Sequence, residues 1–564
     1  MVDSAAQQSL RSPAAHIGYG AIQIDSHSDT RGASTATCEP TPVPSYVRGL
    51  RWLERIPGLQ LLPAVAVTIL LWNLPIYPAS MDPTGPRILS VYAGMIVAVM
   101  TTSYELSVLI LLTLAFLTVT QNLQCHTRDG RPLACNRCGT SRSAGLPSTY
   151  SPLATVDGGI YECDGLSGAF DVAISGFVNK INWLVFCAFH IGKAVMLTGL
   201  GQRIGFGLLR AMSGSVLSLG YAFCLVELAL APFVPSNTAR GGGIIYPIVI
   251  SVIQALNVDQ THNAATARFL VFTAAQANLI SSSFYITGMA GNPLLAHRAH
   301  TVFDIEWDFS RWFVGNLGPG LTILAITPLL TYALFRPRLD PEMAQMAIAH
   351  RSSELKPFSR AEAQLCVILL TALVAWVTTP WTGVDSTVVA FLAFALVVVT
   401  EILPWREVLA NHTAWDTLFW LGSFIILAQQ LNEFGVSAWL GGVLSYRLDG
   451  LGPWSALWAL AVIYAATMYL FSSMTSHIMA LSAPLLMAAA DLGCPPLPAI
   501  AIVSYLGPLS ACVTNYSTGV LSMYFSEKYI ERSAWFRLGL MMLVVYIAVY
   551  ATVGAAWWKI LQWY

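Results

Sequence analysis

Two short polar stretches, each set between long apolar runs, hold the residue types best suited to bind a small anion. The first reads Pro235-Ser236-Asn237-Thr238-Ala239-Arg240-Gly241-Gly242-Gly243, and the second reads Ser473-Met474-Thr475-Ser476-His477. In the first, the proline ends one helix, three small polar side chains follow, and the glycines allow close approach of the backbone. Hydroxyl and amide groups beside a helix start, with its free N–H groups, bind carboxylates. An ordinary Ser/Thr/Asn helix cap is the simpler alternative.

Two further segments have the polar, glycine-interrupted composition of unwound helix middles. They read Thr287-Gly288-Met289-Ala290-Gly291-Asn292-Pro293 and Thr514-Asn515-Tyr516-Ser517-Thr518-Gly519. Freed carbonyl groups in such segments coordinate a cation, and their N–H groups bind an anion. We expect substrate-binding side chains at Thr287, Asn292, Thr514, Asn515 and Thr518. The alternative is that the glycines serve tight helix packing.

Charged residues beside the two tips extend this prediction. Arg240 follows the first tip, and a buried arginine can hold a carboxylate through two parallel hydrogen bonds. It can equally form a conformational lock with an acid such as Glu227, and both interpretations stay open. His477 adds a group that can be cationic to the second tip, beside Ser473 and Thr475.

The elements that position these residues must lie in a membrane. Hydrophobic residues make up 55% of the 564 and charged residues 10%, whereas soluble domains carry about 25% charged residues. In lipid, each apolar run must be helical, because nothing there pairs with free backbone groups. The sequence therefore predicts an all-α polytopic membrane protein. With a net charge of -1 and no basic stripe, we expect no nucleic-acid partner.

Some apolar runs are too short to cross alone, since a spanning helix needs about 20 residues. The segments 213–234 and 244–257 are joined by a few small polar residues, as are 454–471 and 478–491. This pattern is typical of re-entrant hairpins, here expected over 213–257 and 454–491. Two hairpins and about eleven crossings place the basic loops 336–362 and 526–537 on the side of the N-terminus, in accord with the positive-inside rule.

The polar segments divide the chain into four parts. We expect a disordered tail over 1–56, a first half over 57–335, a basic cytosolic linker over 336–362 and a second half over 363–564. The first half contains a loop insertion, 121–169, with Cys125, Cys135, Cys138 and Cys163. On the side opposite the basic loops, four cysteines suggest two disulfides, with a zinc site as the alternative.

Three landmarks recur in the same order about 230 residues further on, which indicates an internal repeat. NWLVFCAFHIGKAVMLTGLG (182–201) matches DTLFWLGSFIILAQQLNEFG (416–435), PSNTARGGGIIYP (235–247) matches SSMTSHIMALSAP (472–484), and ITGMAGNPL (286–294) matches VTNYSTGVL (513–521). An odd number of crossings in each half inverts the two copies. Inverted repeats with broken helices are typical of secondary transporters that hold substrate near the membrane midplane. No HExxH or GxSxG sequence supports an enzyme.

These residues resemble the divalent anion/sodium symporter family of solute carriers, and within it the 2-oxoglutarate/malate translocator branch. The resemblance is carried by PSNTARGGGIIYPI, TGMAGNPLLA, TAWDTLFWLGSFIILAQQLNEFG and GAAWWKILQWY, and covers about 59–120 and 170–564. It implies a homodimer in which a mobile domain moves elevator-fashion against a static scaffold. It also implies that two Ser-Asn-Thr tips bind substrate carboxylates. The first falls on Ser236, Asn237 and Thr238; the second falls on Ser473, Met474 and Thr475, where the asparagine is absent.

The missing asparagine makes a full pair of sodium sites doubtful, although Ser236, Asn237 and Gly288 form a candidate residual sodium site. We therefore expect a sodium-independent exchanger of dicarboxylates such as 2-oxoglutarate, malate and succinate, with Arg240 and His477 offsetting the substrate's charge. No cofactor and no other metal are expected. The alternatives are a sodium-coupled di- or tricarboxylate symporter and a carrier of sulfate or phosphate. For its location, an organelle envelope (plastid or mitochondrial) and the plasma membrane are both left open.

Overall fold

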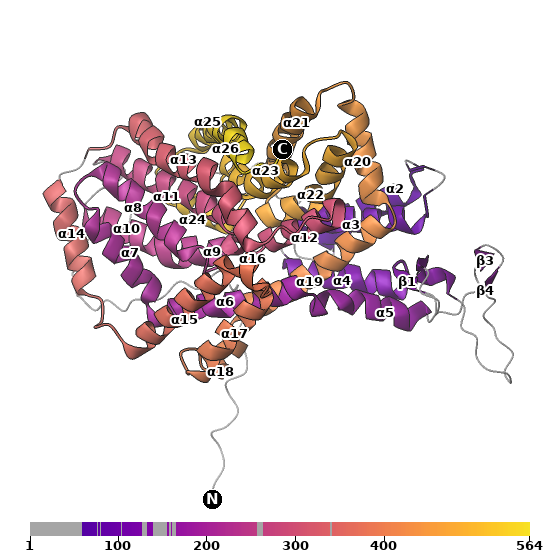
Figure 1. The fold of residues 1–564 in the computed structure, drawn as a ribbon, viewed down its shortest axis with the longest axis horizontal. Helices are drawn as coiled ribbons and strands as arrows, with labels where there is room; N and C mark the ends of the chain where they lie inside the picture. The colour runs from indigo at the N-terminus through magenta and orange to yellow at the C-terminus, as the bar shows by residue number, and fades with distance from the viewer. Residues whose placement is uncertain are drawn as a thin grey trace, which may run out of the picture. The chain divides into compact units, whose positions relative to one another are not determined.

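The computed structural model describes residues 59–564 except 76, 79–80, 103, 127–131, 139–154, 157–158, 161–164, 257–262 and 339–340. The expected tail over 1–56 and Cys163 of the insertion lie outside the described residues. The described chain is mostly helical (Figure 1), which confirms the predicted fold class at that level. Strands in the described ranges form two short antiparallel pairs, β1 (Gln124–His126) with β2 (Pro132–Ala134) and β3 (Thr155–Val156) with β4 (Gly159–Ile160).

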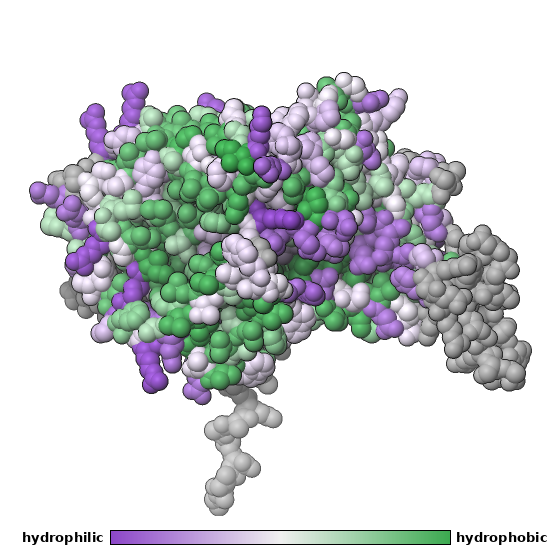
Figure 2. All heavy atoms as spheres, in the orientation of Figure 1, coloured by the Kyte–Doolittle hydropathy of each residue, from purple (hydrophilic) through white to green (hydrophobic). Residues whose placement is uncertain are grey.

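Six helical stretches in the described ranges are long and apolar enough to cross a membrane, judged by length and composition. They are α6 (Lys180–Thr198), α13 (Phe309–Phe335), α15 (Arg360–Val377), α21 with η7 (Pro453–Leu470), α23 with η8 (Pro496–Val513) and α25 to α26 (Arg532–Ile560). On α15, Val367, Leu370 and Val374 form an exposed apolar row. Figure 2 shows hydrophobic residues over much of one face of the molecule. Such rows fit a lipid environment, because water would penalise them.

Two runs of elements follow the same order along the chain. Each begins with a long helix, α6 in the first run and α19 (His412–Glu433) in the second. A glycine with positive φ follows each helix, Gly199 at +78° and Gly435 at +74°, because glycine adopts this left-handed conformation without strain. The next helix is α7 (Leu200–Ala211) in the first run and α20 (Val436–Arg447) in the second.

Each run continues with two helical arms that meet at a polar tip. In the first run, α8 (Val216–Leu230) leads to the tip, and α9 (Asn237–Arg240), the π-helical turn η5 (Gly241–Ile245) and α10 (Tyr246–Ala255) lead away. In the second run, α21 (Pro453–Thr467) and η7 (Met468–Leu470) lead to the tip and α22 (Met474–Asp491) leads away.

A broken helix follows each pair of arms. The first consists of α11 (Ala264–Phe284), η6 (Ile286–Gly288) and α12 (Asn292–Phe303), and the second of α23 (Pro496–Leu509), η8 (Ser510–Val513) and α24 (Gly519–Ser526). The breaks are extended at Met289, Thr514 and Thr518. Each run then ends in a long apolar stretch, α13 in the first and α25 (Arg532–Val549), η9 (Tyr550–Gly554) and α26 (Ala555–Ile560) in the second.

The arms and the broken helices of the two runs pack against one another. α11 contacts α8, α13 and α23, and α22 contacts α12, α20, α21 and α23 (Figure 1). A second group surrounds α6, which packs on α17 (Ser386–Val399) and α19, while α3 (Thr84–Thr101) contacts α2 (Leu62–Asn73), α4 (Leu106–Val119) and α19. The packing thus brings both tips and both breaks into one cluster of helices.

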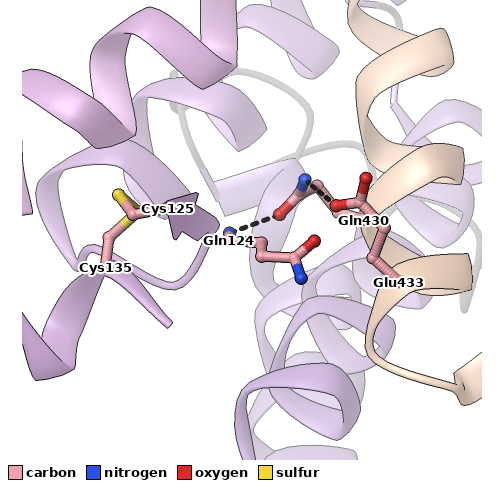
Figure 3. The surroundings of a disulfide bond; sticks show 5 residues. All are labelled: Gln124, Cys125, Cys135, Gln430 and Glu433. Atoms are coloured by element: carbon pink, nitrogen blue, oxygen red, sulfur yellow. Dashed lines mark hydrogen bonds between the residues drawn. A yellow bond between two sulfur atoms is a disulfide. The ribbon is translucent and has the colours of Figure 1, made fainter. Parts of the chain in front are cut away.

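Within the insertion, a disulfide joins Cys125 and Cys135 (Figure 3). Cys138 is also disulfide-bonded. These cysteines are therefore not available as the thiolate ligands that a zinc site needs. Beside the disulfide, the backbone N–H of Gln124 donates to Gln430 of α19 at 2.5 Å. The cross-link thus holds β1 where it contacts the core helices.

Candidate functional site

The first tip is ordered by its own side chains. The Ser236 hydroxyl caps α9 by accepting a hydrogen bond from the Ala239 N–H at 3.1 Å. The Asn237 amide donates to the Thr518 hydroxyl at 2.9 Å. Thr238 lies beside the same segment, because a Cβ placed on Gly519 would be 3.2 Å from Thr238 Cγ2. The first tip therefore touches the second break.

The second tip repeats this arrangement. Ser473 caps α22 by accepting a hydrogen bond from the Ser476 N–H at 3.3 Å. The Met474 N–H donates to the Ser517 carbonyl at 2.8 Å. Thr475 lies beside the first break, because a Cβ on Gly291 would be 3.6 Å from Thr475 Cγ2. Residues 514–519 therefore contact both tips, through Thr518 and Gly519 on one side and Ser517 on the other.

Six of the predicted substrate-binding residues are partly exposed and can be reached by a ligand. We refer to this set as the tip site: Ser236, Asn237, Thr238, Ser473, Thr475 and Asn515. Its groups are hydroxyls, amides and the N–H groups of two helix starts, which suit an anion of small size. In the second tip, Met474 is buried (3% exposed) where the first tip has Asn237. The second tip therefore offers one polar side chain fewer.

The other predicted side chains in the breaks are buried and mainly hold the unwound backbone. The Thr287 hydroxyl donates to the Pro232 carbonyl at 3.0 Å. The Asn292 amide donates to the carbonyls of Ser282 (2.7 Å) and Tyr285 (2.8 Å). Thr514 and Ser517 share a hydrogen bond of 2.5 Å. The Thr287 and Asn292 contacts pair backbone carbonyl groups, whereas the contact between Thr514 and Ser517 joins two hydroxyls of the second break.

Arg240 forms an ion pair with Glu227, which was one of its two predicted roles; the other was to bind a substrate carboxylate. Both side chains are fully buried, and the Nε to Oε2 distance is 2.7 Å. Nη1 donates to the carbonyls of Val234 (2.8 Å) and Gly288 (2.9 Å), and Nη2 donates to Ser281 (2.9 Å) and Ser282 (3.0 Å). A guanidinium has five N–H donors, so none is left for a substrate in this conformation.

His477 faces the first arm of its own hairpin. Its ring stacks on Tyr464 at 4.5 Å and 19°, and Nε2 lies 2.9 Å from the Tyr464 carbonyl. Since a carbonyl only accepts, Nε2 carries the proton in that contact. The Thr467 hydroxyl lies 3.0 Å from the same nitrogen. His477 is fully buried, so it supports the tip from behind and does not line its exposed side.

Sequence reasoning missed a group of polar residues on α11. Asn278 donates to Glu227 at 3.0 Å and to the Asn237 carbonyl at 3.1 Å. Ser281 also donates to Glu227, at 3.0 Å. Asn278 thus joins the buried ion pair to the first tip. The signal was present in the sequence, because polar residues at Asn278 and 281–283 interrupt an otherwise apolar helix.

Comparisons with known proteins show the family of this chain. A family model described as the sodium:sulfate symporter transmembrane region matches residues 57–564. Dicarboxylate transporter 1, chloroplastic, of Arabidopsis thaliana is 32% identical over 396 residues, which cover 69% of this chain and 71% of the relative. The L-tartrate/succinate antiporter of Escherichia coli K12 is 31% identical over 397 residues, which cover 68% of this chain and 80% of the relative.

Among solved structures, MtrF of Neisseria gonorrhoeae, described with a class of antimetabolite efflux pumps, has the same fold. Its TM-score is 0.50 at 15% identity, over 80% of this chain and 94% of MtrF. At that identity the similarity concerns the fold alone. It agrees with a mostly helical, polytopic membrane architecture.

Proposed function

The chain belongs to the sodium:sulfate symporter family, and on that premise we propose that it exchanges small dicarboxylates across a membrane without sodium. Its relatives support the substrate and the exchange, because one is named a dicarboxylate transporter and another an L-tartrate/succinate antiporter. Family members are membrane transporters and not enzymes. The observation that carries the proposal is the tip site, in which one short segment, 514–519, contacts both polar tips.

The chemistry of the tip site suits a dicarboxylate. Two helix starts, α9 and α22, each present a serine cap and a threonine near free N–H groups. A carboxylate accepts several hydrogen bonds, so each tip is matched to one end of a diacid. Malate, succinate and 2-oxoglutarate share these two ends. We propose Ser236, Asn237, Thr238, Ser473 and Thr475 as its main ligands, with Asn515 between them.

Sodium independence is supported by where the Arg240 guanidinium lies. Nη1 occupies the carbonyls of Val234 and Gly288 at 2.8 and 2.9 Å, which are the kind of oxygens that a broken helix offers to a cation. The candidate sodium site at Ser236, Asn237 and Gly288 would therefore compete with a fixed cation. Glu227 neutralises Arg240, so the guanidinium fills these carbonyls without adding net charge to the site.

The finer architecture is also a proposal. We propose about eleven crossings and two re-entrant hairpins in an inverted repeat, because the two runs of elements follow the same order through tip, break and long helix. We also propose that 57–335 and 363–564 are the two halves joined by the linker 336–362, and that the transporter works as a homodimer with an elevator motion. The chain is an integral membrane protein in any of the candidate membranes.

Reconstituted vesicles test the proposed activity. Vesicles loaded with unlabelled succinate should take up labelled succinate, and vesicles without internal dicarboxylate should take up little. Replacing sodium by potassium on both sides should leave the rate unchanged. Uptake that requires a sodium gradient and proceeds into empty vesicles would contradict exchange.

Sulfate transport is the second candidate, because the matching family model is described by sodium and sulfate. Sulfate is also a compact dianion and would fit helix starts. Competition decides between the two substrates. Excess malate should abolish labelled succinate uptake while sulfate has little effect; the reverse order would identify an inorganic-anion carrier.

A further inference from the structure

Arg298, on the helix that follows the first break, is a buried cation without a counter-charge. It lies on α12 and is 2% exposed. Among the described residues it makes no salt bridge, and its Nε has no hydrogen-bond partner. Arg240, which is also buried, has all five donors paired. The protein thus pairs every N–H donor of the buried Arg240, whereas it leaves the Nε–H of Arg298 without an acceptor.

The surroundings of Arg298 do not offset its charge. Among the described residues, the ionisable side chains that interact electrostatically with it are His297 and Tyr92 of α3, a phenol that is neutral near pH 7. His297, its neighbour in sequence, is at most another cation. A guanidinium is always charged in a protein and is penalised when it is buried without an anion. Such a residue persists where an anionic partner arrives during function.

Helix geometry places Arg298 on the side of α12 that faces the second tip. Gly291 lies seven residues earlier, on the same face of the helix, and a Cβ there would be 3.6 Å from Thr475 and 3.4 Å from Ile478. Seven residues correspond to about 10 Å of axial rise, and arginine side chains lean back toward the N-terminus of their helix. The guanidinium can therefore lie within about one helical turn of the level of Gly291.

Helix α22, which packs on α12, carries a second buried polar group without a partner. Ser482 lies one turn beyond Ile478 on the same face of α22. It is fully buried, and its hydroxyl has no hydrogen-bond partner among the described residues. Arg298 and Ser482 thus supply a cation and a hydroxyl donor, both unpaired and both carried by helices that pack together, and these are the groups that bind a compact anion.

We propose that Arg298, with Ser482, binds one anionic group of the substrate beneath the second tip and so selects doubly charged substrates. The inference rests on the proposed function. Arg298 supplies the fixed positive charge for the substrate that Arg240, which is paired with Glu227, does not provide. Without substrate the charge stays unpaired, which raises the free energy of the empty carrier during its return. Substrate or counter-substrate removes that penalty, so exchange is faster than net transport.

The test compares Arg298→Met, Arg298→Lys and the exposed control Arg311→Met in full-length protein in vesicles. Labelled succinate exchange is inhibited either by succinate, a dianion, or by succinamate, its monoanionic half-amide. The inhibition constant of succinamate divided by that of succinate measures the preference for the dianion. This ratio should fall about tenfold or more in Arg298→Met. It should stay near the wild-type value in the other two variants. A wild-type ratio in Arg298→Met overturns the proposal.

Thermal unfolding of the detergent-purified protein gives a second, independent measurement. Arg298→Met should unfold at the same or a higher temperature than wild type without ligand, because an unpaired buried charge is removed. It should lose most of the stabilisation that succinate gives the wild type. An unfolding temperature that falls, with the succinate effect intact, would show a structural role and would overturn the proposal.

Separate ligands distinguish this proposal from the proposed function. If wild-type vesicles exchange no succinate, the proposed dicarboxylate exchange is wrong. The anion site at Arg298 is then tested by itself, through the thermal unfolding temperature in the presence of sulfate or chloride. A stabilisation by either ion that Arg298→Met loses supports the site; equal stabilisation of both proteins overturns it. A chloride effect without a succinate effect identifies an inorganic ion as the ligand.

Discussion

Asn278 connects the buried Glu227–Arg240 ion pair to the tip site. It donates to Glu227 and to the Asn237 carbonyl, and lies 3.5 Å from the Asn237 amide. A change in the Glu227–Arg240 pair can therefore shift the first tip through the two hydrogen bonds of Asn278. At the residue scale, the buried ion pair and the proposed binding site share one hydrogen-bond network.

Breaking the buried ion pair should destabilise the protein strongly. Glu227→Gln leaves the Arg240 guanidinium buried without a counter-charge, and we expect a loss of about 3–5 kcal/mol in the free energy of unfolding. The double variant Glu227→Leu with Arg240→Met should recover much of that loss, because neither charge remains. Thermal unfolding of the purified protein measures both, with the exposed Glu306→Gln as control. A Glu227→Gln variant as stable as wild type would contradict the pairing.

The contact between the first tip and the second break can be measured by a double-mutant cycle. Asn237→Ala and Thr518→Val each remove one partner of the 2.9 Å hydrogen bond. Each should lower succinate exchange about tenfold, which corresponds to about 1.4 kcal/mol. The double variant should be little worse than either single one, because the two groups act together. Effects that simply add would show that they act independently, and Asn73→Ala is the control.

Individual side chains were the part of the site least accessible to sequence reasoning. The tip residues were predicted because polar groups between apolar runs are costly in a membrane and are therefore typical of a functional site. The two interpretations of Arg240 stayed open, because the sequence does not show which acid packs against it. Arg298 was missed because it lies beyond the break, and only its burial without an anion distinguishes it from a surface arginine.

At the element scale, the helix breaks follow from local composition, and the insertion does not. Proline, glycine and hydroxyl residues end helices wherever they occur, so the breaks near Gly288 and Ser517 were predictable. The short strands β1 and β2 were not, because three-residue strands carry no periodic signal. A cross-link between Cys125 and Cys135 lies beside their pairing, and sequence alone assigns neither cysteine a particular partner.

Removing that cross-link should loosen the contact between β1 and α19. Cys125→Ser with Cys135→Ser opens a loop with a sequence separation of 10, and the chain-entropy model gives a loss of about 3 kcal/mol. Hydrogen exchange of the Gln124 N–H, which is bonded to Gln430 (Figure 3), should become faster. Cys366→Ser, which changes a free cysteine, should leave it unchanged. Unaltered protection in the double variant would show that the strands hold without the bond.

At the scale of the whole molecule, charge distribution sets the orientation. The basic loops around Lys356 and Arg532 are expected on one side and the turn after α12 on the other, because basic loops stay cytosolic. The membrane class was accessible from composition alone. The way α11 and α22 gather the two tips was not, since it depends on packing between helices far apart in sequence.

Labelling from one side of the membrane tests this orientation. Single cysteines at Lys356 and Arg532 should react with an impermeant maleimide from the same side. A cysteine at Asp304, whose side chain is 95% exposed, should react from the opposite side. Labelling of all three from one side would contradict the predicted number of crossings between them.

The short stretch 514–519 fastens both tips at once, through the Asn237–Thr518 and Met474–Ser517 hydrogen bonds. Because both tips are hydrogen-bonded to the same segment, neither tip can move away from it without breaking one of those bonds. A bound diacid would then be released when the two tips and segment 514–519 move together to a position exposed to water. The two tips would stay hydrogen-bonded to that segment throughout.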